Sequence, residues 1–147
     1  MKRIFVAVVL LTLLLVPVLS YAENYNDLPE KFFTLLKKGK PSEAIDFVYG
    51  TNKWMSRDAD QMINLKNQLT QVNKLVGHYL FNELIMEGKT GNHYVHLIYL
   101  VGYERQPLRF ELKLYKPKEE WIFFGISFDT KLTDQIEKQS NEKLVQR

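Results

Sequence analysis

The sequence predicts an α+β fold in which three N-terminal helices pack on a sheet of four antiparallel strands. Apolar residues recur at helical spacing over residues 27–76, and over residues 79–129 the period of the pattern changes to two. The links between the strand-like segments are short, so neighbouring strands must run antiparallel as a meander. Helices first and strands second is the order typical of α+β proteins.

The first 22 residues have the composition of a secretory signal peptide. Lys2 and Arg3 precede an apolar run over residues 4–19, and residues 20–22 (Ser-Tyr-Ala) have small side chains at the −3 and −1 positions of a cleavage site. The run is shorter than the roughly 20 residues that cross a bilayer. We therefore expect cleavage after Ala22 and export to the periplasm or the medium, with an uncleaved membrane anchor as the alternative.

The remaining chain predicts one domain over residues 23–130, followed by a polar tail or short helix over residues 131–147. The formal net charge is +3, and loss of the leader with Lys2 and Arg3 lowers it by two. A nearly neutral domain lacks the positive surface that nucleic acids require, so no nucleic-acid partner is expected. There is no cysteine, which excludes a thiol nucleophile, a thiolate metal site and disulfides.

Three helices are predicted before residue 78. The first begins at Asp27, where Asp27 and Glu30 have the spacing of a capping box, and ends at Gly39. The second runs from Pro41 to Gly50. The third lies over residues 58–76, and its apolar residues step by three or four positions: Met62, Leu65, Leu69, Val72 and Val76.

Four strands are predicted at residues 79–87, 93–102, 108–116 and 120–129. In the last hairpin, the turn predicts that Leu114 pairs with Ile122, Leu112 with Phe124 and Phe110 with Ile126. Both apolar rows then share one face of the sheet. The opposite face pairs Tyr115 with Trp121.

The first hairpin is apolar on both of its predicted faces. One face groups Tyr79, Phe81, Glu83 and Ile85 with Val95, Leu97, Tyr99 and Val101, and the other groups Leu80, Asn82, Leu84 and Met86 with Tyr94, His96, Ile98 and Leu100. A sheet with one face in water would alternate more clearly. The second face is therefore covered, either by another copy of the chain or by the tail at residues 131–147, and we favour a homodimer through the sheet.

Two segments carry a resemblance to a known family. PLRFEL at residues 107–112, followed by EWIFF at residues 120–124, resembles the last two strands of the nuclear-transport-factor-2-like superfamily, also called cystatin-like α+β. The resemblance implies a sheet that wraps a helix into a cone, whose mouth often holds a pocket. Members include isomerases, dehydratases and exported domains without a known reaction, so the fold does not select a function.

Glu83 and His96 are the candidates for an acid or base in such a cone. If the Tyr79 face points inward, Glu83 lies in an apolar setting beside Tyr99, where burial would favour a general base. If the other face points inward, Asn82 and His96 take that place. Structural or surface roles explain these residues better, because no metal-ligand spacing, nucleophile elbow or phosphate loop accompanies them. We expect no metal and no cofactor.

Aromatic residues are the remaining functional signal, because tyrosine and tryptophan are typical of interfaces and apolar pockets. The sequence favours an exported, non-enzymatic domain that binds a partner protein or a small apolar ligand. A small-molecule isomerase or dehydratase is the alternative, and an inhibitor or immunity-type module is a third. The predicted contact residues are Trp54, Tyr79, Phe81, Tyr99 and Trp121.

Overall fold

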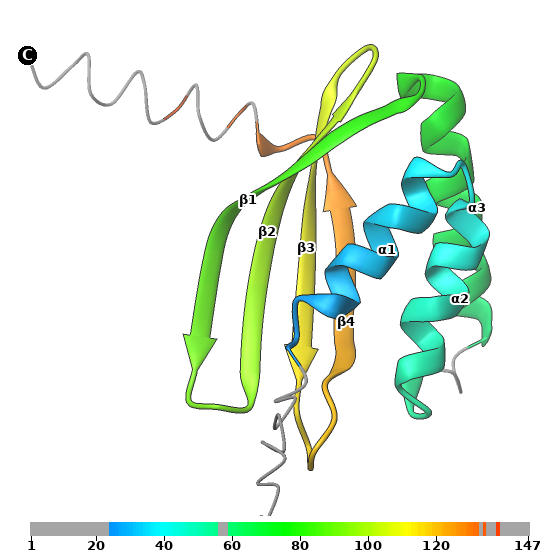
Figure 1. Cartoon of the computed structure of the whole chain (residues 1–147). Helices are drawn as coiled ribbons and strands as arrows, with labels where there is room; N and C mark the ends of the chain where they lie inside the picture. The colour runs from blue at the N-terminus through cyan, green and yellow to red at the C-terminus, as the bar shows by residue number, and fades with distance from the viewer. Residues whose placement is uncertain (1–23, 56–58, 133, 135–137, 139–147) are drawn as a thin grey trace, which may run out of the picture.

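The computed structural model describes residues 24–55, 59–132, 134 and 138. Three helices, α1 (Asp27–Lys37), α2 (Pro41–Thr51) and α3 (Ala59–Val76), precede β1 (Tyr79–Thr90), β2 (Tyr94–Tyr103), β3 (Pro107–Tyr115) and β4 (Ile122–Asp129). The strands form one antiparallel sheet in the order β1-β2-β3-β4. Figure 1 shows all three helices on the same side of this curved sheet. The predicted α+β meander is confirmed, whereas the predicted leader and most of the tail lie outside the described residues.

The helix ends follow the sequence signals only in part. Asn26 is the N-cap of α1 and makes no side-chain capping bond, so the capping box predicted for Asp27 and Glu30 is absent. Both carboxylates lie instead in the first turn, where they favour the positive end of the helix dipole. Gly39 ends the helix with φ +70°, and its N–H donates to the carbonyl of Leu36 at 2.9 Å.

The core lies between α1, α2 and the helix-facing side of the sheet. Phe32 of α1 packs against Phe110 and Phe123, with ring centroids 6.1 and 6.4 Å away. Phe33 lies 4.7 Å from Tyr99. These rings, together with the aliphatic side chains of β2 and β3, are buried, so the interior of the cone is largely filled by side chains.

The helices divide their contacts between the two edges of the sheet. α1 packs beside β1, α2 packs beside β4, and α3 packs mainly on α2. In α3, Leu69 and Val76 are buried, whereas Leu75 is 70% exposed. Among the described residues, no helix combines the length and the apolar character needed to cross a membrane.

A bulge in β4 changes the register predicted for the last hairpin. Leu112 pairs with Ile126 and Phe110 with Phe128, after which the register shifts and Leu114 pairs with Phe123. The predicted pairs of Leu114 with Ile122, Leu112 with Phe124 and Phe110 with Ile126 are therefore wrong. Tyr115 lies opposite Ile122 rather than Trp121. The pairs next to the turn already differ from the prediction by one residue, and the extra residue in β4 adds a second.

β1 departs further from its predicted register. It has two irregularities, one between Tyr79 and Phe81 and one between Leu84 and Met86. Each inserts a residue that switches the face on which the next side chains lie. Leu84, not Glu83, is therefore opposite Tyr99, and the grouping of Glu83 with Tyr99 is wrong. Figure 1 shows β1 bending along its length at the edge of the sheet.

Candidate functional site

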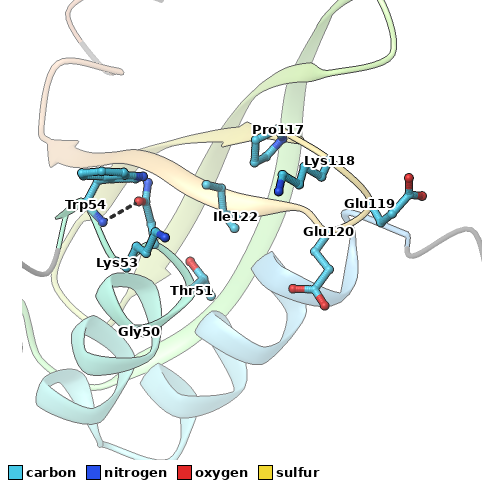
Figure 2. Close-up of a pocket in the computed structure, with 10 residues that line it drawn as sticks. Gly50, Thr51, Lys53, Trp54, Pro117, Lys118, Glu119, Glu120 and Ile122 are labelled. Atoms are coloured by element: carbon cyan, nitrogen blue, oxygen red, sulfur yellow. Dashed lines mark hydrogen bonds between the residues drawn. The ribbon is translucent and has the colours of Figure 1, made fainter.

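An open cleft of about 590 Å³ lies between the loop after α2 and the turn that connects β3 with β4. In Figure 2, Trp54 from the loop and Ile122 from β4 face the same space, while Glu119 and Glu120 lie at the end away from Trp54. The lining residues come from two segments far apart in sequence: Gly50, Thr51, Asn52, Lys53, Trp54, Pro117, Lys118, Glu119, Glu120 and Ile122.

Two polar side chains tie the loop to the edge of the sheet. The Asn52 Nδ2 amide donates to the carbonyl of Phe123 at 2.8 Å. The N–H of Phe123 donates in turn to Thr51 Oγ1 at 3.0 Å, and Thr51 donates to the carbonyl of Val48 at 2.8 Å. β4 is an edge strand, so the backbone groups of Phe123 that point away from β3 pair with Thr51 and Asn52.

Asn52 also positions the residue that dominates the cleft. Its side chain is 6% exposed, and its Oδ1 accepts a 3.0 Å hydrogen bond from the N–H of Trp54. Trp54 itself is 62% exposed, with the ammonium group of Lys53 5.4 Å from its ring. A buried amide therefore fixes the backbone of Trp54, whose large aromatic ring is mostly exposed.

A second cavity, of about 380 Å³, lies between α1 and the first two strands. Phe33 and Tyr99 provide its buried aromatic surface, and Tyr79 with Asn82 provides the wall from β1. The Tyr79 hydroxyl donates to Asn82 Oδ1. Burial raises the pKa of Tyr79 and that of Tyr99 to about 12 each, so both hydroxyls stay protonated at neutral pH. The other lining residues come from the same side of α1: Asn26, Glu30, Thr34 and Lys37.

Two further hollows adjoin β4. One, of about 530 Å³, runs between α3 and β4, and the amide side chains of Gln61, Asn64 and Gln68 line it. The other, of about 130 Å³, lies beside Trp121, whose ring meets that of Tyr25 edge-on at 5.4 Å.

Tyr25 joins the two edges of the sheet. Its hydroxyl donates to Glu87 of β1 at 2.6 Å, and its ring contacts Trp121 just before β4. Lys89 lies 2.6 Å from the same Glu87 carboxylate oxygen, and its hydrogen bond, followed by that of Tyr25, lowers the pKa of Glu87. A residue that precedes α1 thereby links β1 to the segment just before β4.

The predicted acid–base candidates lie on the face of the sheet that turns away from the helices. Glu83 is exposed and pairs with Leu100 across β1 and β2. The His96 Nε2 atom is 3.3 Å from Glu111 Oε2 on β3. Neither side chain enters the filled interior. Within the described ranges, no group of three or more histidine or acidic side chains could hold a metal ion.

The outer face of β3 and β4 carries a charge network instead. Arg109 Nη2 lies 2.7 Å from Asp129 Oδ2 and 3.2 Å from Glu111 Oε1. Burial disfavours the ionised carboxylate of Asp129, but hydrogen bonds from Arg109 and from the backbone of Lys131 outweigh it and lower the pKa of Asp129. These groups are already paired with one another, which is typical of a structural network.

The five predicted contact residues are therefore divided among several surfaces. Trp54 lines the large cleft, Tyr79 and Tyr99 line the cavity beside α1, and Trp121 borders the smallest hollow. Phe81 lies on the outer face, where its ring covers Gly102 so closely that a side chain there would overlap it. The structure does not bring these five together into one site.

Sequence reasoning missed the residues that build the cleft. An asparagine and a threonine after a helix are usual in loops, and nothing in their spacing indicates a contact with a strand some 70 positions later. The bulge in β4 also has no separate signal in the sequence.

No protein-family model and no curated protein matches this chain. Its structure is similar to the crystal structure of a Campylobacter jejuni protein provisionally described as an NTF2-like transpeptidase, with a TM-score of 0.52 and 13% sequence identity. The match covers 68% of this chain and 96% of the other. At this identity the similarity establishes the fold alone. The three helices and the antiparallel meander thus adopt a nuclear-transport-factor-2-like α+β fold.

Proposed function

We propose that this chain is an exported, non-enzymatic binding domain that takes up an apolar group, from a partner protein or a small ligand, in the Trp54 cleft. The main support is the hydrogen bonding of Asn52. The buried Asn52 amide bonds both to Trp54 and to Phe123, and so supports an indole ring that remains 62% exposed. Holding a large apolar surface in water is unfavourable for the isolated domain and becomes favourable when a ligand covers it.

The dimensions and chemistry of the cleft agree with this use. Its volume of about 590 Å³ falls within the range of roughly 300–1,000 Å³ typical of small-molecule sites. Trp54, Pro117 and Ile122 offer apolar surface, while Lys118, Glu119 and Glu120 supply a polar rim. An apolar centre with a charged border is also the usual anatomy of a protein–protein contact.

The alternative of an isomerase or dehydratase has less support. Such a reaction requires an acid or base next to a substrate inside the cone. Glu83 and His96 lie on the opposite face of the sheet, away from the core rings of Phe32, Phe110 and Phe123 and away from the cavity beside α1. Binding is the function that the geometry favours.

The experiment uses the Trp121→Phe variant, because Trp54 is then the only tryptophan in the chain. Titration with anilinonaphthalene sulfonate, an apolar fluorophore that accepts energy from indole, should give saturable one-to-one binding with energy transfer from Trp54. Trp54→Ala should weaken the affinity by at least about fivefold, as expected for a central aromatic contact.

Phe124→Ala is the matched control, because Phe124 is a similarly exposed aromatic residue (57%) that does not line the cleft. It should leave the affinity unchanged. Equal losses from Trp54→Ala and Phe124→Ala, or no loss from either, would contradict binding in the cleft. For a protein partner, capture from the exported fraction of one stoichiometric protein that depends on Trp54 would distinguish an inhibitor or immunity-type module from a small-ligand carrier.

A further inference from the structure

The side of α1 that faces β1 and β2 carries an acid near one end and a base near the other. Glu30 lies in the first turn and Lys37 in the last, and both line the 380 Å³ cavity. Seven residues apart, they lie on the same face of the helix and about 10 Å from each other along its axis. Neither forms an ion pair with any other residue that the structure describes.

Between these two residues the lining of the cavity includes both aromatic and polar side chains. Phe33 and Tyr99 are buried and lie 4.7 Å apart. Asn82 accepts the hydroxyl of Tyr79 with its Oδ1 atom, so its amide N–H groups are the ones left to donate to a ligand. The Thr34 hydroxyl adds a group that can donate or accept.

We propose that this cavity binds a short peptide with free ends, with its ammonium group at Glu30 and its carboxylate at Lys37. An extended chain spans at most about 3.3–3.6 Å per residue, so three residues match the separation of Glu30 and Lys37 along the helix axis. The amide of Asn82 can donate to a backbone carbonyl of such a peptide. The volume of about 380 Å³ is within the range of small-molecule sites.

Ligands that carry only one charge, no charge, or two charges close together match this cavity less well. An anion at Lys37 would leave Glu30 unmatched at the other end of the cavity, and a cation at Glu30 would leave Lys37 unmatched. A wholly apolar ligand would remove water from Asn82 and Thr34 without replacing their hydrogen bonds. A free amino acid carries both charges but is too short to reach both ends. This site and the Trp54 cleft share no lining residue, so the inference is independent of the proposed function.

The test is a titration of the full chain with trialanine, followed by proton NMR of the aromatic side chains. We expect saturable, weak binding that shifts the signals of Phe33, Tyr79 and Tyr99 and leaves the Trp54 indole signal unchanged. N-acetyl-trialanine and trialanine amide each lack one charge, and each should bind about two- to fivefold more weakly, as expected for the loss of one solvent-exposed ion pair. Equal affinity for the blocked and free peptides would overturn the proposal.

Charge exchange provides the sharper measurement. Glu30→Lys and Lys37→Glu should each weaken trialanine binding, whereas the double variant should restore it, because the peptide can then bind in the reverse direction. Lys38→Glu makes the same change of net charge as Lys37→Glu, next to the cavity but outside it, and should have no effect. All three positions are exposed, so the variants should fold normally. A double variant that binds no better than the singles, or an unsubstituted chain without saturable shifts, would rule out the site.

Discussion

At the scale of single residues, two buried polar side chains differ in whether their polar atoms form hydrogen bonds. Asn52 uses its amide N–H and its carbonyl oxygen, toward Phe123 and Trp54. The hydroxyl of Tyr103 is buried and has no hydrogen-bond partner among the described residues. Burial, followed by the nearby hydroxyl of Tyr79, raises the pKa of Tyr103. A satisfied buried group stabilises the fold, whereas an unsatisfied one costs free energy.

Tyr103→Phe should therefore leave the free energy of unfolding unchanged or raise it by about 1 kcal/mol, since it removes a buried hydroxyl that gains nothing from the fold. Urea denaturation followed by circular dichroism measures the change. Tyr79→Phe is the control, because it removes a hydroxyl that does bond, to Asn82, and should lower the stability by about 1 kcal/mol. A loss in Tyr103→Phe as large as in the control would mean that its hydroxyl is satisfied.

Asn52→Ala should lower the free energy of unfolding by about 1–3 kcal/mol, because the carbonyl of Phe123 and the N–H of Trp54 both lose their partner. In the Trp121→Phe background, the emission of Trp54 should also become less anisotropic as the loop loosens. Asn67→Ala, on the exposed side of α3, should change neither quantity. Unchanged anisotropy in Asn52→Ala would show that other contacts hold Trp54.

At the scale of elements, bulges decide which side chains of β1 and β4 reach the core. In β4, the extra residue turns Phe123 into the core, where it is fully buried, and leaves Phe124 57% exposed. Phe124 instead contacts the rings of Tyr94 and Tyr115 on the outer face. The strand keeps its alternation of inner and outer side chains on either side of the bulge, but not across it.

Phe123→Ala should therefore lower the free energy of unfolding by about 3–5 kcal/mol, as is typical for a buried phenylalanine. Phe124→Ala should cost about 1 kcal/mol or less, since it loses only ring contacts at the surface. Denaturant unfolding of the two variants measures the difference. The register predicted from the turn places Phe124 in the core instead, so it requires Phe124→Ala to cause the larger loss of stability.

The pairing of β3 with β4 also carries an acid-sensitive ion pair. Because the pKa of Asp129 in the folded chain lies below its value in the unfolded chain, its pairing with Arg109 contributes fully above about pH 4 and is lost as the pH falls through the folded-state pKa. Asp129→Asn should cost up to about 1 kcal/mol at pH 7. It should also make the loss of stability below pH 4 less steep than in the unsubstituted chain, as urea unfolding at pH 7 and pH 3 would measure.

Glu119→Gln, at an exposed position of the β3–β4 turn, serves as the control and should keep the slope of the unsubstituted chain. An unaltered slope in Asp129→Asn would assign the acid sensitivity to other carboxylates.

At the scale of the whole molecule, the exposed apolar surface is concentrated on β1. Five large apolar side chains of this strand are between 40% and 55% exposed: Leu80, Phe81, Leu84, Ile85 and Met86. The two bulges and the charged Glu83, Glu87 and Lys89 hinder another strand from pairing along this edge. The outer face, where Met86 lies opposite Ile98, is thus the better surface for the homodimer predicted from the sequence.

Sedimentation equilibrium at micromolar concentration should show a dimer that Met86→Lys converts to a monomer, because a charge would be buried at the contact. Leu75→Lys introduces the same charge at an exposed position of α3, away from the sheet, and should leave the dimer intact. A monomeric unsubstituted chain would contradict the predicted homodimer.

The proposed export has a separate test, since the mass of the protein recovered outside the cytoplasm should correspond to a chain that begins at Glu23.

Local patterns in the sequence were sufficient for the element order, the approximate bounds of all seven elements and the antiparallel meander. Helical and strand periodicity, glycine at helix ends and short turns act between near neighbours, so they can be recognised without the rest of the chain. The choice of Trp54 as a residue at a pocket also came from the sequence, from its place in a loop.

Only the tertiary structure decided which side chains share a face and which surface is a site. The irregularity between Tyr79 and Phe81 reverses the faces of the next residues of β1, and the bulge in β4 reverses the faces of the residues between it and the turn. Glu83 is separated from Tyr99 for that reason, and Phe123 replaces Phe124 in the core. The support of Trp54 by Asn52 likewise joins segments some 70 residues apart, and contacts of that range leave no periodic trace in the sequence.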